Sequence, residues 1–587
     1  MNLVKTFQKR SLLLVISVIS IVAVLLAVRL FYLMVPGSGA LSAAAQELHE
    51  RERAIKAERG KIYDRNGVVL ADNMPVCTIS VIHNQITDAE QVIRVLCEEL
   101  GLSEAYVRKR VEKYSSIETI KTNVEKEIAD RIRAYELDGV MVDEDYRRYY
   151  PYNSLASKVL GFTGSDNQGI LGLEVKYDFW LRGENGKILT LATAHGVEIP
   201  DAAENMVTPI AGNSIRTSLD VVIQSYAEQT AMKVLEAKGA KSVSIIVMNP
   251  QNGELYAMVN VPEYDLNHPY DLTEIYTAPY TEAELTQEKK TELLNQMWRN
   301  SCISDTYEPG SAFKIITATA ALEHGVLDVK DSFHCPGYKI VADRRIRCHK
   351  TTGHGTQSFV EAIMNSCNPA FMEIGARTGI EQMYETFRLL GLFQKTGIDL
   401  PGEASSIMHK TEAVGEVELA TISFGQSFQI TPLQLMSAVS TVINGGTRVT
   451  PHFVTEIVNN AGVTIKTIDG CGETGVVSKE TSEIMKMVLE QVVSEGSGSN
   501  AYLEGMSIGG KTATSEKLPR RSGKYIASFL GFAPAENPEV IAMVIIDEPQ
   551  GLYYGGTIAA PVMAEVFEMV LPYLGILPDD TNFMVAE

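Results

Sequence analysis

The chain has few cysteines and fewer basic than acidic residues, and both shortages exclude classes of protein. Its 587 residues include only 7 cysteines, too few for the disulfide framework of a small secreted scaffold, and the odd number leaves at least one thiol without an intramolecular partner. Lys and Arg number 52 against 73 Asp and Glu, a formal net charge of −21. Because nucleic-acid binding requires clustered Lys and Arg to neutralise phosphates, this balance predicts no nucleic-acid partner.

Internal repeats and low-complexity tracts are also missing. Hydrophobic residues make up 45% and charged residues 21% of the chain, a globular composition that excludes a disordered, collagenous or coiled-coil protein. At about 150 residues per domain, the length predicts three or four folding units.

Long apolar runs are lacking everywhere except near the N-terminus. Residues 11–35 contain a single charge, Arg29, and are about long enough to cross a hydrocarbon core. The run is longer than the roughly 7–15-residue apolar core of a signal peptide, although cleavage remains the alternative. The basic residues Lys5, Lys9 and Arg10 precede the run. By the positive-inside rule they predict a cytoplasmic N-terminus, with one membrane span that holds an extracytoplasmic body.

The region between this run and residue 215 is expected to be mixed α/β, without catalytic groups. Residues 41–57 are rich in Ala and Glu and predict a helical stalk. The turn sequence at residues 64–67 lies between two alternating stretches and predicts a β-hairpin. Residues 86–140 have helical periodicity with many charges.

After Gly212, helices and apolar strands alternate in a way that predicts a sheet flanked by helices. A helix is expected over residues 221–239, strands on both sides of a turn at 251–254 and again near 528–535 and 540–548, and a closing helix at 560–574. The fold class is therefore α+β and multidomain, with the expected divisions 1–10 (cytoplasmic), 11–35 (transmembrane anchor), 36–215 (pedestal) and 216–587 (C-terminal domain).

The first motif with chemical potential is Ser311-x-x-Lys314, at the start of a helical pattern that follows Pro309 and Gly310. Residues three apart share one face of a helix. A serine hydroxyl becomes nucleophilic when a neighbouring base takes its proton, and a desolvated amine can be that base. Backbone N–H groups of the first turn can stabilise an oxyanion. For the pair alone, a capped helix with an exposed lysine is the alternative.

The second motif is Ser366-Cys367-Asn368. A second hydroxyl can relay a proton to a leaving amine, and an Asn side chain can hold a substrate amide through both its donor and its acceptor. The alternative is a helix cap before Pro369, and Cys367 is expected to be a small packing residue.

The third motif is Lys511-Thr512-Ala513-Thr514, after a pair of glycines. A strand that presents a cation and a hydroxyl can bind a carboxylate, and its backbone N–H can complete an oxyanion hole. The alternative is an edge strand protected by a lysine.

In this order, S-x-x-K, S-x-N and K-T-x form the motif set of penicillin-binding proteins and serine β-lactamases. The chain resembles a class B penicillin-binding protein, a monofunctional peptidoglycan D,D-transpeptidase of the division or sporulation type. The resemblance implies a pedestal of the dimerisation type and a transpeptidase domain with a central antiparallel sheet flanked by helices. It also covers RGKIYDRNG at 59–67, GLE at 172–174, NPQNGELYAMV at 249–259, FGQSFQITPLQLMSA at 424–438, SFLGFAPA at 528–535 and GGTIAAPV at 555–562.

The resemblance also implies roles for the matching residues. Ser311 would attack the penultimate D-Ala carbonyl of a stem peptide and form an acyl-enzyme, and β-lactams would acylate the same serine. Lys314 would be the general base and would work with Ser366 to protonate the departing D-Ala. An amine of a second stem peptide would then take the acyl group.

Substrate binding is assigned in the same way. Asn368 would orient the substrate amide, and Lys511 with Thr512 would bind the terminal carboxylate. The backbone N–H groups of Ser311 and Thr514 would form the oxyanion hole. The implied partners are peptidoglycan stem peptides on lipid-linked or nascent glycan, β-lactam antibiotics, a membrane glycan polymerase and other division or sporulation proteins.

No metal or organic cofactor is expected, because no group of His and Cys has the short spacing typical of a metal site. Cys335 and Cys348 precede the second motif, and their spacing leaves a disulfide and two free thiols equally open. His354 is expected to be a structural loop residue rather than a catalytic base.

Two other functions compete with transpeptidation. A β-lactamase or β-lactam sensor would share the acylation step, but a hydrolase needs a deacylation base, for which no acidic motif is evident. A non-catalytic scaffold is expected to have lost some of the motif residues, whereas all of them are present in this chain. One departure remains: Ala513 occupies a position where the family has glycine. Its methyl group either moves the strand away from the nucleophile or fills space left by a smaller neighbour.

Overall fold

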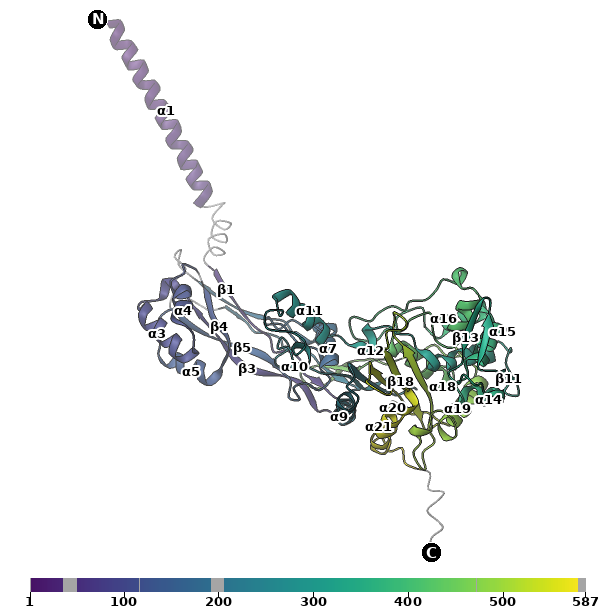
Figure 1. Ribbon diagram of the computed structural model, residues 1–587. Coiled ribbons are helices and arrows are strands. Elements are labelled where there is room, and N and C mark those ends of the chain that lie inside the picture. The colour runs from purple at the N-terminus through teal and green to yellow at the C-terminus, as the bar shows by residue number, and fades with distance from the viewer. Residues whose placement is uncertain (1, 35–49, 116, 192–204, 471, 579–587) are drawn as a thin grey trace. The chain divides into compact units, whose positions relative to one another are not determined.

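The computed structural model describes residues 2–34, 50–115, 117–191, 205–470 and 472–578 (Figure 1). The chain divides into two compact units that alternate along the sequence. The first unit comprises Met1–Glu58, Met74–Arg147 and Glu184–Ile210, and the second comprises Arg59–Asn73, Arg148–Gly183 and Ala211–Glu587. Residues 59–73, 148–183 and 211–215 of the expected pedestal region therefore belong to the same compact unit as the three motifs.

Helix α1 (Asn2–Met34) contains the expected apolar run. Its segment Leu12–Met34 has a mean hydropathy of 2.8, and no part of that window is buried. The segment is long and apolar enough to cross a membrane, whereas residue 35 of the expected anchor lies outside the described residues.

The first unit begins with a strand where a helical stalk was predicted. Strand β1 (Glu50–Ile55) pairs with β6 (Gly186–Leu191), which pairs with β7 (Asn205–Val207). The stalk prediction is wrong for residues 50–55, because pairing with a distant strand satisfies the backbone and overrides local helix propensity. Residues 41–49 of the predicted stalk lie outside the described residues.

The remainder of the first unit contains the helices predicted from charge and periodicity. They pack on an antiparallel strand pair through a small core that includes Ile79, Val92, Leu96 and Ile132. Of these two strands, β4 (Glu118–Glu125) had no clear signal in the sequence, whereas β3 (Val69–Val81) belongs to the predicted hairpin. The elements are η1 (His83–Gln85), α3 (Ala89–Leu100), α4 (Glu104–Val111), β4 (Glu118–Glu125), α5 (Lys126–Ala134) and β5 (Val140–Tyr149).

The predicted hairpin is confirmed. Strands β2 (Ile62–Tyr63) and β3 (Val69–Val81) pair antiparallel, and β2 also runs parallel to β8 (Ser214–Thr217). Strand β8 continues the sheet to β15 (Val454–Val458) and β16 (Thr464–Thr467).

A buried ion cluster joins two of the sequence segments that carried the family resemblance. Arg59 donates to Glu174 Oε2 at 2.7 Å and Arg148 donates to Glu174 Oε1 at 2.6 Å. Burial would raise the pKa of Glu174, but the charges and hydrogen bonds of the two guanidinium groups outweigh it and hold the pKa below its usual value. Through the contact of Glu174 with Arg59, the cluster connects α7 (Gly172–Lys176) to the segment before β2. Two short helices complete this region, α6 (Ser157–Leu160) and α8 (Asp178–Leu181).

The central sheet of the second unit has five antiparallel strands in the order β10-β9-β19-β18-β17. Alternate residues of β9 enter different cores: Val243, Ile245 and Val247 pack with α9 and α21, whereas Ile246 and Met248 face the other core. The predicted α+β sheet flanked by helices is confirmed. The elements are α9 (Val221–Lys238), β9 (Ser242–Met248), β10 (Leu255–Val261), β17 (Gly509–Glu516), β18 (Tyr525–Ala533), β19 (Val540–Asp547) and α21 (Ala560–Tyr573).

The elements between β10 and β17 are mostly helical and carry the first two motifs. The helices are α10 (Glu274–Thr277), α11 (Gln287–Met297), α12 (Ser301–Ser304), η2 (Gly310–Phe313), α13 (Lys314–Glu323), α14 (Phe359–Met364), α15 (Asn368–Thr378), α16 (Ile380–Leu389), η3 (Thr411–Ala413), α17 (Glu416–Ile422), α18 (Pro432–Ile443), α19 (Lys479–Ser494) and η4 (Ser499–Ala501). Besides β15 and β16, four short strands lie among them, namely β11 (Ser332–Cys335), β12 (Tyr338–Val341), β13 (Arg344–Arg347) and β14 (Gly355–Ser358). Helix α20 (Gly555–Ile558) follows β19.

Candidate active site

The segment that leads into Ser311 turns tightly at Gly310. This residue has φ +57°, and a Cβ there would lie 2.6 Å from Ser515 Oγ. A Cβ on Gly425 would in turn lie 2.0 Å from the Gly310 carbonyl oxygen, and the Gly310 N–H donates to the Gly425 carbonyl at 2.9 Å. Only glycine fits this close approach of two backbones. The turn leads into η2, which contains Ser311, and α13, which begins at Lys314.

Lys314 lies at the centre of the first two motifs. Its Nζ is 3.2 Å from Ser311 Oγ, 3.1 Å from Ser366 Oγ, 2.7 Å from the Ser366 carbonyl oxygen and 2.8 Å from Asn368 Oδ1. The side chain is completely buried. Burial lowers the pKa of Lys314 to about 7, although Cys367 and Cys348 act in the opposite direction. A substantial share of the amine is therefore neutral near pH 7, as a general base requires.

The second motif reaches Lys314 through an unusual backbone turn. Ser366 has φ +49°, in the left-handed region, and Cys367 then caps α15, with Pro369 in the first turn of the helix. The Ser366 N–H donates to the Ile363 carbonyl and so continues from α14. Both Ser366 and Asn368 thereby face the same amine, which favours the catalytic interpretation of this motif over a simple helix cap.

The third motif lies on β17, the edge strand of the central sheet, which packs beside η2. Ser515 Oγ donates to the Glu308 carbonyl at 2.7 Å and joins the strand to the segment before the nucleophile. Thr514 Oγ1 accepts from the Gly555 N–H at 2.9 Å. Thr512 Oγ1 lies 3.5 Å from Ser497 Oγ.

Lys511 is completely buried on this strand. Burial, followed by the charge of Lys314, lowers its pKa well below the usual lysine value. Within the part of the chain that the structure describes, its amine hydrogen-bonds to Thr512 and not to the first two motifs. The three motifs therefore meet, but the third joins the others by strand packing rather than by a lysine contact.

Ala513 is buried and its neighbour Gly310 has no side chain. A Cβ on Gly310 would lie 3.7 Å from the Ala513 Cβ, an ordinary van der Waals distance. The pairing of β17 with β18 continues in regular register through Ala513 and Ser528. Of the two outcomes left open by the sequence, this geometry favours a methyl group that fills available space.

Sequence reasoning missed several residues around the site. Glu308 accepts two hydrogen bonds from Arg520 and one from the Ser427 N–H, and Ser497 faces Thr512. Ser497 lies in a short run of Ser and Gly that has the composition of any turn, so no signal marked it. The cluster of Cys335, Cys348, His354 and Cys367 was also missed, because its members lie on four separate segments.

Comparison with known proteins decides the family. Residues 243–568 match the penicillin-binding protein transpeptidase domain, more than half of the chain, and residues 54–217 match the penicillin-binding protein dimerisation domain. The chain belongs to the penicillin-binding proteins. It is 38% identical over 584 residues to stage V sporulation protein D of Bacillus subtilis, covering 98% of this chain and 87% of that protein. It is 26% identical to the peptidoglycan D,D-transpeptidase FtsI of Escherichia coli, covering 90% and 86%.

Solved structures of penicillin-binding proteins and related enzymes share the fold. A peptidoglycan synthetase from Bifidobacterium adolescentis has a TM-score of 0.72 at 22% identity, covering 90% of this chain and 98% of that one. Penicillin-binding protein 3 from Mycobacterium tuberculosis, solved with aztreonam, has a TM-score of 0.65 at 22% identity, with 90% and 98% covered. The class B resemblance, the fold class and the transpeptidase type predicted from the motifs are confirmed by these relatives.

Proposed function

We propose that this chain is a peptidoglycan D,D-transpeptidase that cross-links stem peptides through a serine acyl-enzyme and is acylated by β-lactams. The observation that carries the proposal is the position of the buried Lys314 amine, within 3.2 Å of Ser311 Oγ and 3.1 Å of Ser366 Oγ. One amine in hydrogen-bond contact with two hydroxyls from separate segments of the chain is the arrangement that serine activation and proton relay require.

Acylation uses the first two motifs. Neutral Lys314 takes the Ser311 proton while Oγ bonds to the penultimate D-Ala carbonyl carbon and forms a tetrahedral oxyanion. The backbone N–H groups of Ser311 and Thr514 stabilise that oxyanion. Ser366 then passes a proton from Lys314 to the departing D-Ala nitrogen as the C–N bond breaks, which leaves the acyl-enzyme and a neutral amine.

The other motif residues position the substrate. Asn368 holds its amide, and Lys511 with Thr512 binds the terminal carboxylate. An amine from a second stem peptide then attacks the ester carbonyl, and Lys314 accepts the amine proton. The bond between the carbonyl carbon and Ser311 Oγ breaks, and Lys314 returns that proton to Oγ, which restores the free serine and the neutral lysine. No step calls for a metal or an organic cofactor.

We also propose that this chemistry takes place at the cell surface. We assign residues 11–35 to a single-pass anchor, with residues 1–10 in the cytoplasm and the catalytic part outside, 36–215 to a pedestal and 216–587 to the transpeptidase domain. The basic residues before the apolar run support this orientation. The partners are stem peptides of lipid-linked or nascent glycan, together with a membrane glycan polymerase and other division or sporulation proteins.

Covalent labelling with a fluorescent penicillin tests the proposal. The native protein should be labelled, and Ser311→Ala should abolish labelling while the melting temperature changes little, because only one half-buried hydroxyl is lost. Incubation of the native enzyme with a stem-peptide donor and an amine acceptor should give a cross-linked peptide. Labelling that survives in Ser311→Ala would refute the assigned nucleophile, and hydrolysis without cross-linking would refute transpeptidation.

A further inference from the structure

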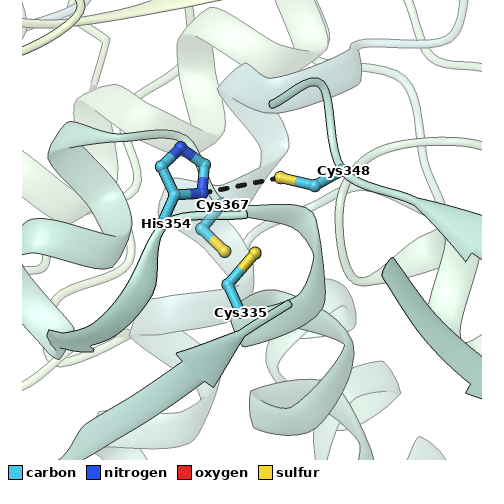
Figure 2. Close-up of side chains that lie close together, drawn as sticks. All are labelled: Cys335, Cys348, His354 and Cys367. Carbon is cyan, nitrogen blue, oxygen red and sulfur yellow. Dashed lines mark hydrogen bonds between the residues drawn. The ribbon is translucent and has the colours of Figure 1, made fainter. Parts of the chain in front are cut away.

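Three cysteines and one histidine meet directly beside the second motif. The Sγ atoms of Cys335, Cys348 and Cys367 and a ring nitrogen of His354 all lie within 4.8 Å of one another. Figure 2 shows the three sulfur atoms and the imidazole directed toward a common point, with Cys348 Sγ 3.7 Å from His354 Nδ1. The three cysteines are buried and His354 is half-buried.

Backbone pairing brings Cys335, Cys348 and His354 together. Strand β11 ends at Cys335, which lies opposite Gly355 of β14, and the His354 N–H donates to the Cys335 carbonyl at 3.1 Å. Cys348 follows β13, and its N–H donates to the Gly337 carbonyl at 2.8 Å. At Gly337, where φ is +92°, a Cβ would lie 2.1 Å from the Thr351 carbonyl oxygen, so the turn requires glycine.

The geometry is close to that of a tetrahedral metal site. Zinc bonds of about 2.3 Å to sulfur and about 2.0–2.1 Å to nitrogen place two sulfurs about 3.8 Å apart and sulfur and nitrogen about 3.6 Å apart. The distance of 3.7 Å between Cys348 Sγ and His354 Nδ1 is close to the sulfur–nitrogen value. All four ligand atoms lie within 4.8 Å of one another, so metal binding needs only a small contraction of the cluster. Three thiolates and an imidazole form a closed ligand set typical of structural zinc.

A disulfide accounts for fewer of these groups than a metal does. It would use two of the three sulfurs and leave a buried thiol and the directed imidazole without a function, whereas one metal ion binds all four.

We propose that Cys335, Cys348, His354 and Cys367 bind one structural zinc ion that holds the second catalytic motif in place. Cys367 lies between Ser366 and Asn368, and both of these neighbours contact the Lys314 amine. A metal bond to Cys367 therefore fixes the backbone that positions the proton relay. The four ligands are positioning residues, and this part of the inference rests on the proposed function, whereas zinc binding itself does not.

Metal content tests the site without reference to activity. The full chain is purified in detergent through a tag without histidine, reduced, given one equivalent of Zn²⁺, desalted and analysed by inductively coupled plasma mass spectrometry. About one zinc per chain is expected. Cys348→Ser and His354→Ala should lose it, whereas the matched controls Cys302→Ser, a buried cysteine outside the cluster, and His268→Ala, an exposed histidine outside the cluster, should keep it. A native protein without bound zinc, or retention by both ligand variants, would overturn the proposal.

Two measurements on the native protein keep the test decisive if a variant fails to fold. Co²⁺ in place of Zn²⁺ should give the intense visible bands of tetrahedral thiolate coordination. Bound metal should also protect Cys335, Cys348 and Cys367 from alkylation, as read by peptide mass spectrometry. A disulfide between any two of these cysteines in freshly isolated protein that takes up no zinc after reduction would show a covalent cross-link instead, and would overturn the metal site.

The effect on catalysis is measured separately. Chelation should lower the penicillin acylation rate about ten- to a hundredfold, the cost of a slightly misplaced catalytic group, and added Zn²⁺ should restore it. Restoration is the readout that a merely unfolded protein would not give. Zinc that binds as expected but leaves acylation unchanged on removal would overturn the positioning role, whereas failure of the Ser311→Ala test would overturn the proposed function and leave the zinc result standing.

Discussion

The acylation rate should depend on pH through Lys314. Burial lowers the pKa of this lysine to about 7, and in the proposed mechanism the neutral form is the base. The neutral fraction then rises from about one tenth at pH 6 to about nine tenths at pH 8, so the second-order acylation rate should rise about tenfold over this interval and level off above it. A lysine of ordinary pKa, about 10.4, would be neutral roughly a thousandfold less often at pH 7.

The assay is the time course of labelling by a fluorescent penicillin, stopped in detergent and read from gels at each pH. Lys314→Ala should react about 100- to 10,000-fold more slowly and should show no rise between pH 6 and 8. Ser366→Ala should react more slowly but retain the rise, because the titrating amine is still present. A flat profile in the native protein, or a rise that persists in Lys314→Ala, would refute Lys314 as the titrating base.

Three further predictions concern stability and architecture. Glu174→Gln should lower the free energy of unfolding by about 3–5 kcal/mol, because it removes the carboxylate that two buried guanidinium groups share and leaves Arg59 its ion pair with Asp178. Glu565→Gln, in an exposed pair with Lys233, should cause no measurable change in denaturant unfolding, and equal effects of the two substitutions would refute the importance of the buried cluster. Ala513→Gly should lower the free energy of unfolding by about 1–2 kcal/mol through lost packing and added backbone freedom. The rates of acylation by several β-lactams should stay within about twofold of the native rates. A large acceleration would show that the methyl group obstructs the site. A chain without residues 1–40 should be soluble and should still be labelled by penicillin, whereas loss of labelling would contradict a simple anchoring role.

Local signals accounted for many of the elements. The helix over Val221–Lys238 and the strands of the central sheet follow from apolar periodicity, because their partners bury the faces that the pattern marks. Strand β1 was missed, because its charged sequence reads as helix and only the pairing with β6 makes it a strand. The Ser366 turn was also missed, because a left-handed φ at a serine is imposed by its surroundings rather than favoured by the residue.

The sequence by itself determined the order of the motifs, and with it the family and the candidates for the reacting groups. It also determined that Ser311 and Lys314 lie close together, since a helical turn sets that spacing. Only the tertiary structure decided that Ser366 and Asn368, more than 50 residues away, contact the same amine. Burial of that amine, which lowers its pKa, likewise depends on packing from many segments, as does the meeting of three cysteines and a histidine. Desolvation and long-range contact are properties of the folded chain, and no local pattern encodes them.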